Sequence, residues 1–250
     1  MQMIFLTAIG VGGATIIGAI IGFFFHNVSH RMNDIILSFA AGIMLAAAII
    51  GLILPSVELV EQSALWLPVV GIFVGALFLN AMDKMTPHLH KLTGVDIETH
   101  GDNRNLDSAL LFMLAVAIHN LPEGMAAGVG FAGEDTSAAL TVAVGIALQN
   151  IPEGIVTVSP LVLAGVKRSR AFLLAAMTGL IEVVGTFIGY SLAAVSTSIL
   201  PFALAFAGGT MLYIISDEMI PETHSHGYER TATYSLLIGF VVMLIMNTVL

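Results

Sequence analysis

The sequence repeats one polar phrase inside two neighbouring apolar stretches, as HNLPEG at 119–124 and QNIPEG at 149–154. In each phrase the first, second and fifth positions fall within about 100° of one another around a helix, so their side chains can point to one place. The two sets are His119, Asn120 and Glu123, and Gln149, Asn150 and Glu153. Imidazole, carboxylate and amide groups together suit a first-row divalent metal ion, and the chain has no Cys to supply a thiolate.

The Pro and Gly of each phrase predict how the two helices are shaped around these side chains. Pro122 and Pro152 have no N–H, so each should kink its helix and free a backbone carbonyl one turn earlier. Gly124 and Gly154 should let a neighbouring helix approach closely. We therefore expect two adjacent helices that each supply half of one cation site.

The elements that carry these phrases must cross a membrane. The chain has 250 residues, of which 57% are hydrophobic and only 10% charged, and its mean hydropathy is +0.97. A soluble domain carries about 25% charged residues. We predict an all-α polytopic helical bundle with eight transmembrane helices in the lipid bilayer, as one domain over 1–250. The predicted spans are roughly 3–25, 35–55, 65–82, 107–131, 138–163, 171–195, 201–220 and 232–250.

Charge predicts the orientation of the bundle. All eight Lys and Arg residues fall in the first, third, fifth and seventh connections, whereas the second and fourth carry acids such as Glu58. The positive-inside rule places the four basic connections in the cytoplasm and both termini outside. The longest is a cytoplasmic His-containing loop at 83–106. The start of the chain is expected to be the first span rather than a cleaved signal peptide, and no basic tract suggests nucleic acid.

Several polar side chains are predicted at one depth near the middle of the membrane. Glu123, Glu153 and Glu182 would together cost on the order of 8–10 kcal/mol as buried charges, and no Lys or Arg lies in a span to neutralise them. The carboxyls must be protonated, face water or bind a cation. Their clustering with His and amides favours a cation. Met44, on the second span, has the same predicted depth.

Two facing carboxylates can also bridge two metal ions. One ion would then use His119 and the Gln149 side, and the other Asn120, Asn150 and Glu182. A proton or cation channel that uses the same carboxyls is an alternative, but it would not need clustered His and amides. An intramembrane metalloenzyme is a second alternative. It would need an H-E-x-x-H type of motif, which the sequence lacks.

Further polar residues are candidates for weaker metal sites at the two membrane faces. Glu58 lies outside in the predicted topology, where it would attract cations. The cytoplasmic tracts HLH and HSH suggest metal capture, and acids at the end of span seven suggest an exit relay toward HSH. The residues concerned are His88, His90, Asp217, Glu218, Glu222, His224 and His226.

The paired motif resembles the ZIP (Zrt/Irt-like) family of divalent metal transporters. HNLPEG is followed in the next span by a second N-x-P-E-G, and the ending LYIISDEMIPETHSHG resembles the bacterial GufA-like branch. The resemblance covers nearly the whole chain. It implies uptake of divalent metals toward the cytoplasm across the cell (inner) membrane, with zinc the leading substrate and Fe, Mn, Co or Cd accepted.

The resemblance also implies a site and a mode of action. It implies a binuclear site in which the metal is substrate rather than cofactor, held by the two motif triplets with Glu182 and Met44 as additional ligands. It implies that the first, fourth, fifth and sixth helices move as a unit against the others, and that the chain forms a homodimer. Some relatives carry His or Asp at the positions of Gln149 and Asn150, so the amides here make the site less negative.

Overall fold

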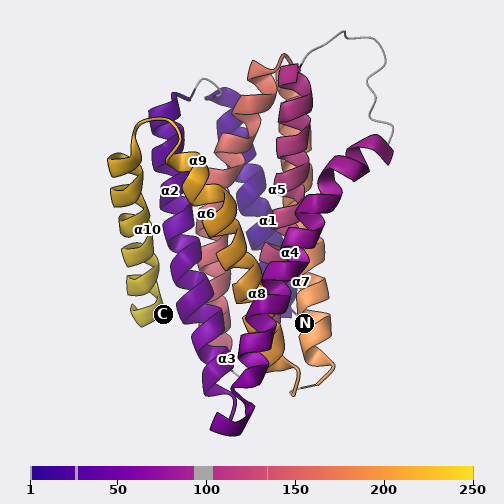
Figure 1. The fold of residues 1–250 in the computed structure, drawn as a ribbon, viewed down its shortest axis with the longest axis vertical. Helices are drawn as coiled ribbons and strands as arrows, with labels where there is room; N and C mark the ends of the chain where they lie inside the picture. Colours follow the sequence, from indigo (N-terminus) through magenta and orange to yellow (C-terminus); the bar gives the residue numbers. More distant parts are fainter. Residues whose placement is uncertain (1, 26–27, 93–103, 134, 197, 250) are drawn as a thin grey trace.

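The computed structural model describes residues 2–25, 28–92, 104–133, 135–196 and 198–249, without the side chains of 83, 85–92, 104–112 and 115. The described residues form helices and no strand (Figure 1). The longer α-helices are α1 (Gln2–Phe24), α2 (His30–Ala46), α4 (Trp66–Leu92), α5 (Arg104–Val129), α6 (Thr136–Leu163), α7 (Arg168–Ala194), α8 (Leu200–Ile214) and α10 (Glu229–Val249). The shorter helical segments are η1 (Ala47–Ile53), α3 (Leu54–Glu58), η2 (Gln62–Ala64), η3 (Gly130–Ala132), η4 (Ile215–Met219) and α9 (Ile220–Thr223).

The predicted helical membrane bundle is confirmed. Seven helical segments of the described residues are long and apolar enough to cross a membrane. They are Gln2–Phe24, His30–Glu58, Gln62–Met82, Thr136–Leu163, Arg168–Ala194, Leu200–Thr223 and Glu229–Val249. The more polar α5, with 26 residues, packs closely along α7 and is our candidate for the eighth span. The count of eight and the orientation stay predictions.

Two helices are longer than predicted. α2 begins at His30 rather than near 35, because the Ser29 hydroxyl caps it by accepting a hydrogen bond from the Met32 N–H at 3.3 Å. α4 continues to Leu92, so His88 and His90 lie on a helical backbone while their side chains are outside the description. Of the predicted 83–106 loop, residues 93–103 also lie outside the described residues.

The long helices pack most closely in four pairs, α5 with α7, α1 with α6, α4 with α8 and α2 with α10, and α1 also packs along α7. We call α1, α5, α6 and α7 the α1 group, and α2, α4, α8 and α10 the α2 group. Inside each group, glycines bring backbones together. A Cβ added at Gly124 of α5 would lie 2.2 Å from the Glu182 carbonyl oxygen of α7, and one at Gly42 of α2 would lie 2.0 Å from that of Leu236 in α10. Such seams leave no room for sliding.

Contacts of glycines between the two groups are different. Gly51 of η1 faces the Val142 side chain of α6, and Gly145 of α6 faces the Met243 side chain of α10. Side chains can change rotamer, whereas a backbone carbonyl in a seam cannot withdraw without moving its helix. At these two contacts the groups meet through side chains rather than through backbone.

Candidate metal centre

The two motif phrases meet inside the α1 group, where α5 and α6 run side by side. Asn120, Glu123, Gln149 and Asn150 are almost completely buried, His119 is 6% exposed, and Glu153 is half-buried. The motif glycines explain this placement. Gly124 abuts Glu182 of α7, and a Cβ added at Gly154 would lie 2.3 Å from the Thr15 carbonyl oxygen of α1. The predicted close approach at both glycines is confirmed, and Pro122 and Pro152 lie inside continuous helices.

Glu182 lies at the centre of a hydrogen-bond network that joins all four helices of the α1 group. Its Oε1 accepts from the Thr15 hydroxyl at 2.6 Å and from the Asn120 amide, and its Oε2 accepts from the Asn150 amide at 2.6 Å. Hydrogen bonds to a charged acceptor contribute about 1.5–3 kcal/mol each. The network therefore stabilises a carboxylate that no Lys or Arg side chain of the described residues neutralises, and it fixes the orientation of both amides.

With their N–H₂ groups held by Glu182, the two amides present their oxygens elsewhere. Asn120 Oδ1, Asn150 Oδ1 and Glu123 Oε2 are buried and have no hydrogen-bond partner among the described residues. The Gln149 amide lies beside the Glu123 carboxylate. Buried polar atoms are normally paired, so these oxygens fit the donor set of a cation site. No three His, Cys, Asp or Glu side chains of the described residues are arranged around one metal position. A site here thus depends on amide oxygens as well as carboxylates.

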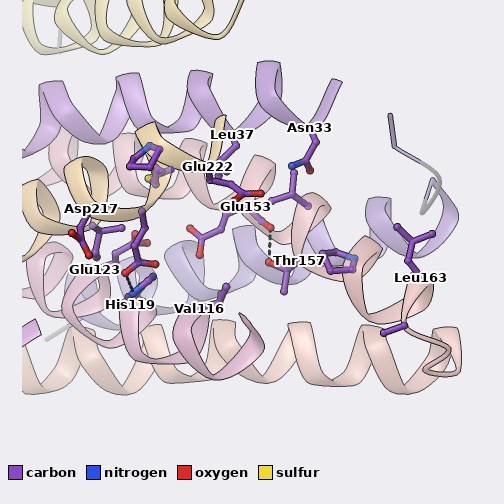
Figure 2. A pocket seen from close by; sticks show the side chains of 17 residues that line it. Asn33, Leu37, Val116, His119, Glu123, Glu153, Thr157, Leu163, Asp217 and Glu222 are labelled. Atoms are coloured by element: carbon purple, nitrogen blue, oxygen red, sulfur yellow. Dashed lines mark hydrogen bonds and ion pairs between the residues drawn. The ribbon is translucent and has the colours of Figure 1, made fainter. Parts of the chain in front are cut away.

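A pocket of about 790 Å³ leads from this region to the surface of the protein. Figure 2 shows His119, Glu123 and Glu153 along it, with Asp217 and Glu222 among the other acids that line it. The His119 ring Nε2 lies 2.7 Å from Glu218 Oε1, a residue of the π-helical segment η4. π-helical turns often occur at functional sites because they redirect side chains. The pocket reaches the exposed Leu163 and Glu222 at the end predicted to be cytoplasmic.

The remaining predicted residues lie apart from this donor set. Met44 is buried in the apolar core, and Glu58 is exposed at the end of α3. The His224 ring bonds within its own region, to the Ile220 carbonyl at 2.9 Å and the Thr233 hydroxyl at 3.1 Å. His226 lies 3.0 Å from Asp34. The structure thus brings Asp217, Glu218 and Glu222 to the pocket but does not bring the HSH histidines to it.

Sequence reasoning missed three polar residues. Thr15 donates a hydrogen bond to Glu182, Asn33 lines the pocket, and Asp34 is buried next to His226. The predicted spans leave Asn33 and Asp34 in a loop, and only the Ser29 cap signal indicates that they belong to a helix. A Thr inside an apolar span carries no such signal.

Comparison with known proteins places this chain in a family. The family model described as ZIP Zinc transporter matches residues 95–247. Zinc transporter GufA of Myxococcus xanthus is 44% identical over 202 residues, which cover 78% of each chain. Zinc transporter ZIPB of Bordetella bronchiseptica is 36% identical over 95% of this chain and 78% of its own, and human zinc transporter ZIP11 is 30% identical over 93% and 92%.

These relatives are transporters rather than enzymes. Together with the seven apolar helical segments, the similarity to them shows that the chain is a multi-pass protein of the cell (inner) membrane. The paired phrases, the buried donor set and the similarity over most of the chain point the same way. The chain belongs to the ZIP family of zinc transporters, in its GufA-like branch.

Proposed function

We propose that this chain carries divalent transition-metal cations, zinc foremost, into the cytoplasm through the site between α5 and α6. The observation that carries the proposal is the set of buried oxygens of Asn120, Glu123 and Asn150 that have no hydrogen-bond partner among the described residues, together with a pocket that His119, Glu123 and Glu153 line. Nitrogen and oxygen donors of this kind suit zinc and neighbouring first-row ions. The two neutral amides limit the charge of the site, so a bound ion can also leave.

The pocket supplies the path of release. His119 belongs to α5 in the α1 group, whereas its partner Glu218 belongs to η4, which continues α8 of the α2 group. Glu218 is one-third exposed, and beyond it lie the exposed acids Asp217 and Glu222. An ion that leaves Glu123 and Glu153 thus meets a series of carboxylates that leads to the cytoplasm in the predicted orientation. Glu218 holds the His119 ring when the ring is not bound to metal.

The opposite side of the site supports alternating access over an open channel. A buried apolar cluster fills the space between the groups, and it includes Val142 and Ile146 of α6 together with Ala48 and Leu52 of η1. These four residues are at most 2% exposed. A hydrated ion cannot cross such a layer at low cost. For an ion to arrive from outside, the α1 group must shift against the α2 group, which the side-chain contacts at Gly51 and Gly145 permit more readily than the backbone seams within each group.

Glu182 takes a different role from the other two acids in this proposal. Both of its oxygens already accept hydrogen bonds, from Thr15, Asn120 and Asn150. It stands behind the amides and aims their oxygens at the metal, as carboxylates do when they orient ligands from outside the coordination sphere. Whether one or two ions bind at once depends on whether Glu123 and Glu153 bridge them.

The test is uptake by purified protein in liposomes, with Zn²⁺, Cd²⁺, Mn²⁺ and Fe²⁺ offered outside. We expect saturable influx of zinc, abolished by Glu123→Ala and by Glu153→Ala. Glu229→Ala is the matched control, since Glu229 is an exposed acid at the start of α10, away from the pocket. A folded protein that moves none of the four ions would refute the proposal. Flux that persists in both glutamate variants would refute the site.

A further inference from the structure

A second cluster of metal-ligating residues lies on α2, away from the pocket. His30, Asp34 and Ser38 stand at positions i, i+4 and i+8, which form one stripe along the helix. His226, from the connection between α9 and α10, places its ring Nδ1 3.0 Å from Asp34 Oδ1. Asn33 and Leu37 line the transport pocket from a neighbouring face of α2, but none of the residues of this stripe does.

The Asp34 carboxylate has few hydrogen-bond partners among the described residues for a group so deeply buried. Its side chain is fully buried, and its sole polar partner among the described residues is His226. Asp34 Oδ2 and the Ser38 hydroxyl are both buried without a hydrogen-bond partner among those residues. Glu182, by comparison, accepts three hydrogen bonds. A buried carboxylate needs a compensating charge or full hydrogen bonding, and Asp34 has neither beyond one imidazole.

The two histidines stand over this carboxylate and reach solvent. The rings of His30 and His226 stack with centroids 4.6 Å apart and planes 25° from parallel. His30 is exposed and the His226 side chain is 25% exposed. Two imidazoles next to a carboxylate form a donor set for a borderline divalent ion such as Zn²⁺. The three side chains do not yet surround one point, but His30 is the first residue of its helix and His226 lies in a connection, where rings can turn.

We propose that His30, Asp34 and His226 bind a second divalent transition-metal ion, separate from the transported one. Asp34 Oδ2 provides the buried anionic ligand, and the two rings close over the ion from the solvent side. Bound metal fastens the α9–α10 connection to the start of α2. Both elements belong to the α2 group, and the site therefore braces that group rather than joining the two groups.

The test removes the transport site first, so that its outcome does not depend on the proposed transport function. The full chain carrying Glu123→Ala and Glu153→Ala is purified in detergent, and Zn²⁺ binding is measured by equilibrium dialysis, with Co²⁺ absorption as a second reading of ligand geometry. We expect one remaining ion per chain. Asp34→Asn and His226→Gln, each added to that background, should weaken its binding by at least about tenfold, since even an outer partner of a metal ligand contributes 10–100-fold.

His224→Gln is the matched control. His224 lies two residues from His226 in the same HSH tract, but its ring bonds to Ile220 and Thr233 instead. It should leave the affinity unchanged and the variant should elute as a single species. If the background binds no zinc, or if His224→Gln weakens binding as much as His226→Gln does, the proposal is wrong. His30→Gln tests the third proposed ligand without altering the buried carboxylate: it should also weaken zinc binding, and unchanged binding would contradict the proposal.

Discussion

Replacing Glu182 by Gln tests whether this residue aims the two motif amides at the metal. Glu182 Oε1 accepts from Thr15 and Asn120, and Oε2 accepts from Asn150. A Gln side chain can keep its oxygen at the first position, but its N–H₂ group then faces the N–H₂ group of Asn150. Asn150 must lose this hydrogen bond or turn its amide over. If it turns, an N–H₂ group replaces Oδ1 at the metal.

The size of the effect follows from that exchange. One hydrogen bond to a charged acceptor contributes about 1.5–3 kcal/mol, which corresponds to about 10- to 150-fold in affinity. We expect Glu182→Gln to raise the KM of zinc uptake in liposomes, and the zinc Kd of the purified protein, by a factor in that range. Thr15→Val should give a smaller change in the same direction, because it removes one donor and leaves both the charge and the amides in place.

Thr186→Val is the control for this prediction. The Thr186 hydroxyl is buried one turn along α7 and bonds to the backbone carbonyl of Glu182 at 2.9 Å, not to its carboxylate. Its removal should affect stability but not zinc affinity. The reasoning is refuted if Glu182→Gln binds zinc as the unaltered protein does, or if Thr186→Val weakens binding equally.

Three further outcomes are expected. Gly124→Ala should overpack the α5–α7 seam and lower the free energy of unfolding by about 1–3 kcal/mol, measured as a lower Tm. Gly13→Ala is the control, because its Cβ would meet nothing within 4 Å, and an equal fall in its Tm would contradict the close packing of the seam. Glu218→Gln should lower the maximal rate of uptake more than it changes KM, because it removes the negative charge that faces His119 on the release path; an unchanged rate would contradict that role. A disulfide between Gly51→Cys and Val142→Cys, in a chain with no native Cys, should stop uptake until it is reduced, and each single variant is the control; uptake by the crosslinked protein would show that the two groups need not move at that contact.

The clustering of the motif side chains was predictable because the spacing of the motifs is local. Positions i, i+1 and i+4 share a helix face in any helix, and an apolar span of known length sets the depth of each residue. For this reason the sequence predicts that the two motif triplets and Glu182 lie at one level, and in the structure all of them except the half-buried Glu153 are buried. Gly124 and Gly154 predicted the close helix packing for a similar reason, because a residue without a Cβ lets a neighbouring helix approach at that position.

The placement of Glu218 and Asp34 was not predictable in the same way. Glu218 reaches His119 from a π-helical segment, and an apolar sequence such as LYIIS before it carries no sign of the wider turn. Asp34 lies in a helix that begins after the Ser29 cap, and its partner His226 comes 192 residues later in the chain. The HSH tract looked like an extension of the exit path, yet its rings bond to Thr233 and to Asp34 instead.

The three glutamates predicted at mid-membrane depth have three different environments in the structure, and each environment indicates a different role. Glu182 is satisfied by donors from three other helices and belongs to the frame. Glu123 is just as buried but keeps an oxygen without a partner among the described residues, and Glu153 is half-buried and faces the pocket. The insertion cost of a charge is the same for all three on composition alone. Glu123 and Glu153 are the two carboxylates whose charge is not offset by full hydrogen bonding among the described residues, and both line the pocket through which a cation can arrive. We therefore expect the removal of either one to end transport.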